Sequence, residues 1–362
     1  MYPIQDHNVS CYFPVGRRRS HAMTVQQPTH WPAHRPCLFD LHDLPTLEAA
    51  WPRTRATFAE MRACLEADPV EGVRSVVVSG SLGRMEQLPA SDGDLIVVVD
   101  DRTAWDVDAC GTAWNRVWDL IEPVGLARPR GHGIFSEVTS PSELGDLSTR
   151  GVIDERVGPY GRRIQLLLDA QPVYGSESYA DVLTSVLERF ADPSPGRSEW
   201  VYLLNESIRY FRSMCVSAQW EHREAAGAWR VRNGKLRHSR LLNYVGLLVS
   251  LGEASRQGVR DIAWLRERLK LTPLERVLAV ADTESAREVM ATYERFLELL
   301  ADPAFVERLK ADWPAGERHD PGATGEYGSL RENAHKLQVL LLHVVRQRQD
   351  QWTSRFREYL IV

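Results

Sequence analysis

Two short apolar runs, VRSVVVSG at residues 73–80 and DLIVVVDD at 94–101, constrain the fold of this chain more than any other feature. Both runs are rich in β-branched residues and are bounded by turn-forming residues, which is typical of buried strands. The connection between them is short and contains the glycine and proline expected of turns. A third apolar run, RRIQLLLD at 162–169, predicts another strand followed by a turn. Apolar residues at helical spacing predict helices within 44–68 and 103–122.

The second half of the chain has a different pattern. Beyond about residue 177 the strand pattern ends, and apolar residues recur at positions i, i+3 and i+4. We therefore predict an α+β protein, with a small α/β domain over residues 41–191 followed by an all-helical C-terminal domain over 192–362. The segment DPSPGRS at 192–198 would join the two domains. Residues 1–40 are expected to form a disordered tail. About the first 36 of them are rich in Pro, His and Gln, and their apolar residues follow no helical or strand period.

Composition and charge exclude several classes of protein. The chain has 44 Lys and Arg against 49 Asp and Glu, a net charge of −5, so no overall positive field attracts nucleic acid or an anionic membrane. Nucleic acid is a disfavoured partner on this ground, although a local basic surface would still permit it. The longest apolar stretches are shorter than the roughly 20 residues of a bilayer span, so no membrane association is expected.

Cysteine usage predicts a cytoplasmic protein. The five cysteines are odd in number, lie far apart and form no CxxC pair, which is unlike a disulfide framework or a cysteine zinc site. Both Met1 and Met23 are candidate starts of translation, and a start at Met23 would remove most of the tail. The pattern leaves the oligomeric state open.

The segment between the first two predicted strands combines a Gly-Ser turn with two closely spaced aspartates. The first strand ends in Gly80-Ser81, and the second begins at Asp92-Gly93-Asp94. Because side chains alternate along a strand, both carboxylates point to the same face, where they repel each other unless a cation lies between them. Mg²⁺ is typically held by one or two carboxylates together with nucleotide phosphates. Glycine lets the backbone approach a phosphate closely, so the segment predicts neighbouring metal and phosphate sites.

The segment GSLGRMEQLPASDGDLIVVV resembles the GS…DxD motif of the polymerase-beta-like nucleotidyltransferase superfamily, in the GSxGRxE…SDxD form of bacterial uridylyl- and adenylyltransferases and their uncharacterised relatives. The resemblance implies that an acceptor hydroxyl attacks the α-phosphate of a nucleoside triphosphate (NTP), with ATP the first expectation, and that pyrophosphate leaves. Asp92 and Asp94 would hold Mg²⁺ or Mn²⁺. Gly80 and Ser81 would bind the β- and γ-phosphates, and Arg84 would add positive charge. The acceptor, a small molecule or a protein, does not follow from the fold.

The superfamily also has a third carboxylate on a later strand, which completes the metal site or acts as a base. Two residues are candidates here. Asp169 closes the third apolar run, and Glu137 lies in the segment GIFSEVTS. Asp169 is favoured because the run before it is the better strand, and Glu137 remains the alternative.

The helical half carries a second resemblance. IRYFRSMCV and WRVRNGKLRHSRLLNYVGLL are similar to segments of C-terminal domains attached to some of these bacterial nucleotidyltransferases. Lys235 and Arg240 are predicted to bind phosphate, and Arg209 and Arg212 are the next candidates, because arginine and lysine neutralise phosphate oxygens. The alternative is that these cations lie on solvated helix faces and pair with glutamates one turn away.

Two other functions are compatible with the pattern. A regulatory protein could keep the fold and bind a nucleotide without transferring any part of it. The helical half could instead be a toxin-like or RNA-processing module, because Arg232-Asn233 followed by His238 is similar to the R-x(4–6)-H motif of HEPN ribonucleases.

Overall fold

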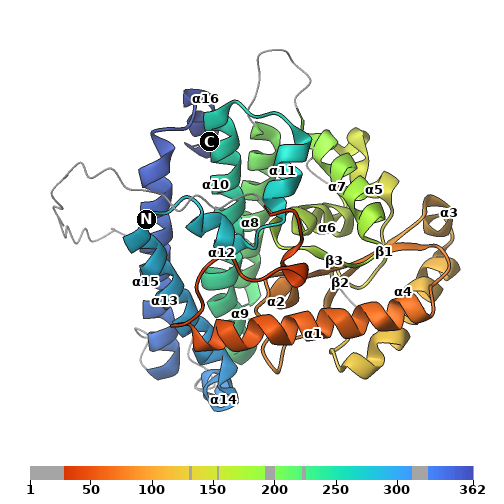
Figure 1. Cartoon of the computed structure of the whole chain (residues 1–362), viewed down its shortest axis with the longest axis horizontal. Helices are drawn as coiled ribbons and strands as arrows, with labels where there is room; N and C mark the ends of the chain where they lie inside the picture. The colour runs from red at the N-terminus through yellow and green to blue at the C-terminus, as the bar shows by residue number, and fades with distance from the viewer. Residues whose placement is uncertain are drawn as a thin grey trace.

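The computed structural model describes residues 28–129, 133–152, 155–191, 200–221, 226–311 and 325–361. In this part of the chain a small sheet lies at one side of the molecule, and the long helices α8, α10, α13 and α15 lie toward the other side (Figure 1). The sheet has three strands in the order β2-β1-β3, and both pairs are antiparallel. The strands are β1 (Val73–Ser79), β2 (Asp94–Val99) and β3 (Gln171–Tyr174).

The pairing of β1 and β2 brings the two ends of the motif together. Ser79, the last residue of β1, lies opposite Asp94, the first residue of β2. The middle of both strands is fully buried, as expected for their β-branched side chains. Beyond β2, Thr139 forms an isolated parallel bridge with Val98. The edge of the sheet that carries Gly80 and Asp94 is therefore set by a buried strand pair.

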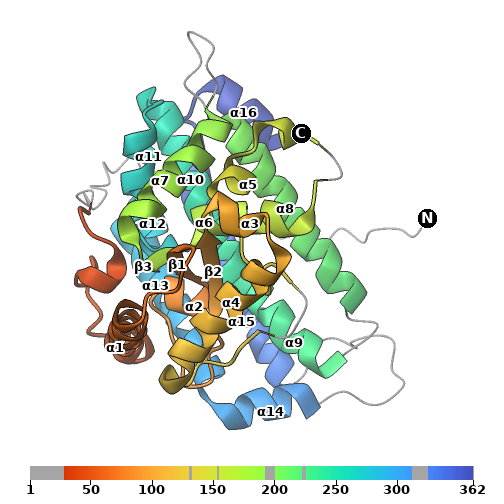
Figure 2. The same ribbon diagram turned by 90° about the vertical axis from the view of Figure 1, so that its right-hand side faces the viewer.

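Short helices and one long helix surround the sheet. The long helix α1 runs along one side of the sheet (Figures 1 and 2). Phe58, Met61 and Leu65 of α1 share a hydrophobic cluster with Val76 and Val78 of β1. The elements of this region are η1 (Pro32–His34), α1 (Pro45–Ala67), α2 (Gly80–Gly83), α3 (Asp101–Ala104), α4 (Val107–Ile121), η2 (Glu122–Val124), α5 (Pro141–Gly145), η3 (Leu147–Thr149), α6 (Val157–Leu168) and α7 (Ser176–Phe190).

After β3, the described residues contain helices and their connections but no further strand. The α+β region is thus followed by a largely helical region, as the sequence predicts. Three of its elements, α9, the π-helical turn η4 and α10, follow one another without a break. The elements are α8 (Val201–Glu221), α9 (Ala226–Lys235), η4 (Leu236–Arg240), α10 (Leu241–Gln257), α11 (Ile262–Leu269), α12 (Pro273–Leu278), α13 (Thr283–Ala301), α14 (Pro303–Ala311), α15 (Gly325–Gln349) and α16 (Ser354–Ile361).

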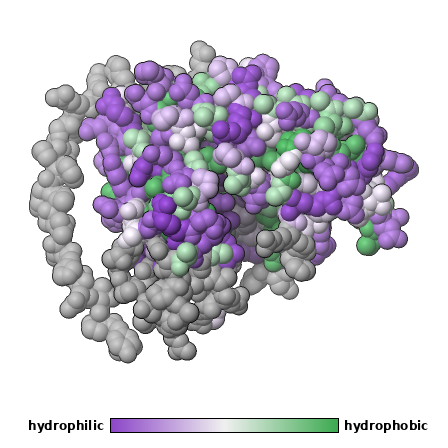
Figure 3. Space-filling model, turned by 90° about the horizontal axis from the view of Figure 1, so that it is seen from below, coloured by the Kyte–Doolittle hydropathy of each residue, from purple (hydrophilic) through white to green (hydrophobic). Residues whose placement is uncertain are grey.

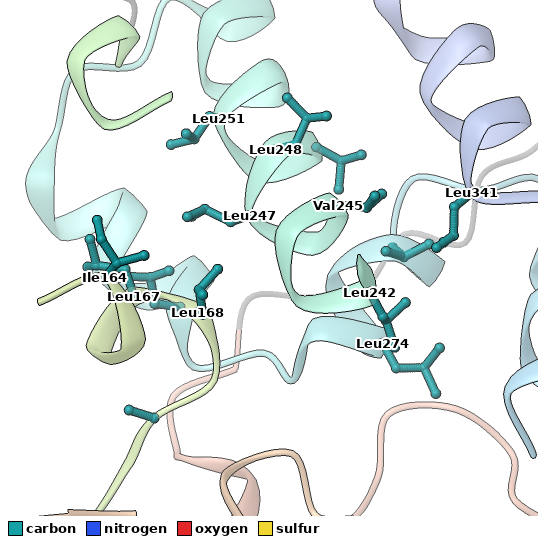
Figure 4. Packing of buried hydrophobic residues seen from close by; sticks show 14 of the residues in the cluster. Ile164, Leu167, Leu168, Leu242, Val245, Leu247, Leu248, Leu251, Leu274 and Leu341 are labelled. Carbon is teal, nitrogen blue, oxygen red and sulfur yellow. The ribbon is translucent and has the colours of Figure 1, made fainter. Parts of the chain in front are cut away.

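One of the two hydrophobic clusters among the described residues runs through both regions. Ile164 and Leu167 of α6 belong to the same buried cluster as Leu247 of α10 and Leu341 of α15 (Figure 4). Burying a leucine side chain stabilises a fold by roughly 1.5–3 kcal/mol, so this shared core holds α6 firmly against α10. The helical region is consequently packed against the residues that precede β3.

The third strand is not where the sequence predicts it. Residues 157–168 form helix α6, and β3 occupies residues 171–174, where a turn is expected. Ile164, Leu167 and Leu168 follow helical spacing and are buried together. A short apolar run is compatible with a strand or with a buried helix, and here the packing against α10 decides for the helix.

Part of the predicted N-terminal tail is also folded. Ala33 donates its backbone N–H to Oε1 of Gln171 at 3.0 Å. The guanidinium of Arg35 donates to both carboxylate oxygens of Glu275, at 2.6 and 2.7 Å, and both side chains are buried. Contacts with distant residues therefore order residues 28–40, whereas residues 1–27 and the predicted joint at 192–198 lie outside the described residues.

The surface is mixed in character. On the described part of the face seen in Figure 3, hydrophobic residues are interspersed with hydrophilic ones. Within the described residues, no helix has the length and apolar character needed to cross a membrane.

Candidate active site at the edge of the sheet

The turn after β1 requires glycine for two separate reasons. Gly80 has a φ of +67°, in the left-handed region that other residues adopt at a cost. A Cβ atom at this position would also lie only 2.3 Å from Oδ2 of Asp94. The next residue, Ser81, donates from Oγ to Oγ of Ser91 at 3.0 Å, which ties the turn to the segment before the carboxylates. The structure thus brings Gly80, Ser81 and Asp94 into direct proximity.

The two motif carboxylates lie side by side at the start of β2. Asp92 is exposed and Asp94 is partly exposed. Within the described part of the chain, neither carboxylate accepts a hydrogen bond. Burial raises the pKa of Asp94 to about 7, and the negative charges of Asp92 and Asp169 add to this shift. The pair is therefore a crowded anionic site whose repulsion a bound cation would relieve.

The loop that carries these carboxylates is tightly packed. A Cβ atom on Gly93 would lie 2.9 Å from the ring of Trp118, so the backbone between the two aspartates rests against that ring. Asp92 also forms a parallel β-bridge with Ala127. The separation of the two carboxylates is consequently set by a buried aromatic side chain and a backbone bridge.

Asp169 lies beside this pair but is bound by protein groups. It follows the last residue of α6, and its side chain is fully buried. Oδ1 accepts from Oγ of Ser79 at 2.6 Å and from Nε2 of Gln165 at 3.2 Å. Oδ2 accepts from Nη1 of Arg84 at 2.7 Å and from Nδ2 of Asn243 at 2.6 Å. Four donors thus occupy the carboxylate that the sequence favours as the third acidic residue.

Arg84 is part of the same buried network. Its Nε donates to Oε2 of Glu86 at 2.8 Å, and its Nη1 donates to Asp169. Tyr293 of α13 donates from its hydroxyl to the same oxygen of Glu86 at 2.9 Å. Met85, between the two charged residues, has a φ of 64°, which is a strained conformation for a residue with a side chain. The charge of Arg84 therefore balances buried carboxylates in this structure.

Glu137, the alternative third acidic residue, has a different environment. Its side chain is 66% exposed and lies 3.0 Å from the buried guanidinium of Arg162. It precedes Val138 and Thr139, the residue that bridges to β2. Within the described residues, no group of three or more His, Cys, Asp and Glu side chains is arranged to hold a metal ion. The environment of Glu137 thus differs from that of Asp169, which protein donors enclose.

Lys235 is the last residue of α9 and Arg240 is the last residue of η4 in the helical region. Both side chains are exposed, and neither forms an ion pair within the described part of the chain. The positive charge of Lys235 acts to lower the pKa of Asp94. Burial raises the pKa of Tyr210 to about 12, while Arg240 acts to lower it and Asp94 acts to raise it. Lys235 thus acts on Asp94, and Arg240 and Asp94 both act on Tyr210.

The other two predicted cations lie on α8. The guanidinium of Arg209 lies 4.6 Å from the ring centre of Tyr160 and 3.5 Å from Glu206. The charge of Arg212 acts to lower the pKa of Tyr244, which burial raises. A groove of about 680 Å³ on α8 is lined by Asn205, Ile208, Arg209, Arg212, Ser213, Val216 and Ser217. The structure thus places these two arginines beside aromatic residues of α6 and α10.

Side chains that connect the two regions are not predicted from the sequence. Asn243 reaches Asp169 from α10, and Tyr210 donates from its hydroxyl to Oε1 of Gln165 at 3.3 Å. One signal was available for Asn243, because it interrupts the apolar run LLNYVGLL with a buried amide. No comparable pattern marks Gln165, which lies in the run that resembles a strand.

His238 does not lie on an accessible surface. It is fully buried and stacks on Phe296, with ring centres 4.1 Å apart. Its Nδ1 lies 2.8 Å from the backbone oxygen of Gly234, and its Nε2 lies 3.0 Å from Nδ2 of Asn333. Burial lowers the pKa of His238 to about 4. In this position the imidazole is a structural group and does not meet the needs of a ribonuclease site.

Residues 54–139 match the model of the family described as "Putative nucleotidyltransferase DUF294". The matched segment contains the strand pair β1 and β2, the Gly80-Ser81 turn, and both Asp92 and Asp94. No curated protein matches the chain. The family similarity therefore supports a nucleotidyltransferase region at the edge of the sheet that the carboxylate pair occupies.

Proposed function

We propose that this protein is a metal-dependent nucleotidyltransferase that moves a nucleoside monophosphate from an NTP to an acceptor hydroxyl and releases pyrophosphate. One observation carries the proposal: the paired carboxylates Asp92 and Asp94 lie beside the left-handed Gly80 turn and within the influence of Lys235. The family similarity over residues 54–139 supports the same reaction class.

The carboxylate pair fits a divalent cation, for which Mg²⁺ and Mn²⁺ are the candidates. Asp92 and Asp94 accept no hydrogen bonds within the described residues, and their mutual repulsion helps to raise the pKa of Asp94 to about 7. Two carboxylates completed by phosphate oxygens form a typical Mg²⁺ site. When bound, such an ion neutralises phosphate charge and stabilises the attacking and leaving oxygens.

The surrounding residues would bind and orient the triphosphate. Gly80 is buried and places no side chain between its backbone and Asp94, and the partly exposed Ser81 carries a hydroxyl at the same turn. Lys235 and Arg240 supply positive charge from the helical region. Holding the α-phosphate near the acceptor hydroxyl and neutralising its charge would supply most of the rate enhancement. ATP is the expected nucleotide.

The third acidic residue has two distinct candidates. Asp169 is enclosed by four donors and is suited to holding Arg84 and the end of β1 in place. Glu137 is largely exposed, so an incoming acceptor can reach its carboxylate. We propose Glu137 for the proton of the acceptor hydroxyl. Glu137→Gln should then lower the transfer rate more than it weakens NTP binding.

The test is transfer of label from each α-³²P-labelled NTP with Mg²⁺ or Mn²⁺, alone and with a desalted cell extract that supplies acceptors. The double variant Asp92→Asn/Asp94→Asn should lose metal-dependent transfer and pyrophosphate release. Asp108→Asn, on the exposed first turn of α4, is the matched control and should keep them. NTP binding without any transfer by the unaltered protein would contradict the proposal and favour a nucleotide sensor.

A further inference from the structure

The helix that carries Lys235 and Arg240 contains a π-helical turn between them. The turn spans Leu236–Arg240 and is continuous with α9 and α10. In a regular α-helix, residues five apart point about 140° away from each other, because five steps turn the chain by about 500°. In a π-helix, hydrogen bonds join residues five apart, so such residues lie one above the other. The π turn therefore brings the exposed side chains of Lys235 and Arg240 toward a common side.

Buried side chains stabilise this turn. Nδ1 of His238 bonds the backbone oxygen of Gly234 at 2.8 Å, and Oγ of Ser239 donates to the backbone oxygen of Lys235 at 3.1 Å. These bonds add side-chain partners to two backbone carbonyl groups at the start of the turn. His238 is itself held between Phe296 and Asn333. The unusual helix geometry is thus built into the packing of the helical region.

Asn243 anchors the same helix to the sheet region. It lies three residues after Arg240, so the two residues are neighbours on the helix surface. Its side chain is 2% exposed, and its Nδ2 donates to Oδ2 of Asp169 at 2.6 Å. The amide has a defined orientation, because the reverse orientation would place its oxygen against a carboxylate. Its own oxygen Oδ1 is buried and has no hydrogen-bond partner among the residues that the structure describes.

That unpaired oxygen indicates that the position is not optimised for stability. A buried acceptor without a donor destabilises a fold, and an apolar side chain of similar size would remove the defect. The polar residue makes one described hydrogen bond, and that bond leads to the network beneath the candidate active site. Asp169 also binds Oγ of Ser79 and the guanidinium of Arg84, which flank the Gly80 turn. Asn243 thus connects the helix of the two cations to the turn beside Asp94.

We propose that Asn243 is a positioning residue, and that together with the π turn it holds Lys235 and Arg240 as a two-cation clamp for the polyphosphate of an NTP. The helix of the clamp is tied to the candidate active site through Asn243 and Asp169, because Asp169 binds Ser79, which lies opposite Asp94. This inference rests on the proposed function, and it assigns the recognition to the phosphate chain and not to the base.

Binding of inorganic tripolyphosphate in the presence of Mg²⁺ tests the clamp without a base. Asn243→Leu should weaken tripolyphosphate and ATP binding at least tenfold, as measured by calorimetry, and raise the KM for ATP more than it lowers kcat. Thermal stability should fall only moderately, because removal of the unpaired oxygen offsets part of the lost bond to Asp169, whose Oδ2 still accepts from Arg84. The matched control is Ser250→Ala, which removes a buried hydroxyl of α10 whose bond stays within that helix, and it should bind like the unaltered protein.

A second pair of variants tests the geometry of the clamp without changing buried residues. Lys235→Met and Arg240→Met should each weaken tripolyphosphate binding about tenfold, and the double variant should lose less than the product of the two effects, because both cations bind one phosphate chain. Independent effects of the two substitutions would overturn the clamp.

The outcomes separate the inference from the function on which it rests. If the unaltered protein neither binds ATP nor transfers label, the proposed function fails. If it binds and transfers, but Asn243→Leu behaves like Ser250→Ala, the proposed function stands and the positioning role of Asn243 is refuted.

Discussion

Protonation of His238 should destabilise the fold in weakly acidic solution. The pKa of this imidazole is lowered from 6.5 to about 4 by burial. Between pH 6.5 and pH 4 the unfolded chain binds a proton at His238 that the folded protein excludes. The stability contributed by the neutral ring is therefore complete above pH 6.5 and is lost as the pH falls toward 4. At about 1.4 kcal/mol for each pH unit, the full loss is on the order of 3 kcal/mol, of which about 2 kcal/mol is lost by pH 5.

The structure explains why the loss is large. Both ring nitrogens are already engaged, one with the backbone oxygen of Gly234 and the other with the amide of Asn333. A second proton would place two donors, the ring N–H and Nδ2 of Asn333, against each other. Asn333 is held in this orientation because Nδ2 also donates to the backbone oxygen of Thr292 at 3.0 Å.

The assay is urea unfolding, followed by circular dichroism, of the unaltered protein and of His238→Gln at a series of pH values. Other groups titrate in both proteins, so the difference between the two unfolding free energies isolates the histidine. The advantage of the unaltered protein should shrink by about 2 kcal/mol between pH 7.5 and pH 5. A difference that stays constant over this range would refute the assignment of a buried neutral imidazole. His238 also supports the π turn. The His238→Gln variant should therefore bind tripolyphosphate more weakly than the unaltered protein.

Three further predictions concern the site and its supports. Gly80→Ala should abolish label transfer, because the added Cβ would displace Asp94. Gly258→Ala is the control, since Gly258 also has a positive φ, +66°, but no described atom lies within 4 Å of an added Cβ. It should lower stability by about 1 kcal/mol and leave transfer intact. Equal activities of the two variants would contradict the close approach at Gly80. Arg35→Ala should destabilise the fold by about 3–5 kcal/mol in urea unfolding, because it leaves Glu275 buried and unpaired; a loss below about 1 kcal/mol would show that the pair is open to water. Removal of divalent metal with EDTA should stop label transfer, and added Mg²⁺ or Mn²⁺ should restore it; transfer that persists in EDTA would rule out the metal-dependent reaction.

Long-range contacts changed the interpretation of several individual residues. Arg84 resembles a phosphate ligand in the sequence, because it follows the glycine turn, yet Glu86 and Asp169 bind its guanidinium inside the protein. Asp169 closes an apolar run, yet that run is a helix, and one of its four hydrogen bonds comes from Asn243, which lies 74 residues away. The contact of Arg84 with Asp169 and the contact of Asp169 with Asn243 cannot be identified from neighbouring residues, because each joins distant positions of the chain.

The sequence alone determined the elements whose causes are local. The β-branched runs form β1 and β2, and the spacing of Gly80, Asp92 and Asp94 within one short segment places them at one edge of a strand pair. Strand propensity, alternation and the special backbone of glycine act over a few residues, so the sequence is sufficient to predict them.

Only the tertiary structure decided the rest. The choice of helix for residues 157–168 depends on packing against α10, and the order of residues 28–40 depends on Glu275, 240 residues from Arg35. The charge of Lys235 acts on Asp94 from the helical region, and Asn243 of the same region donates to the buried carboxylate of Asp169. Burial and hydrogen-bond pairing are properties of the assembled core, and no local pattern in the chain specifies which distant partners will supply them.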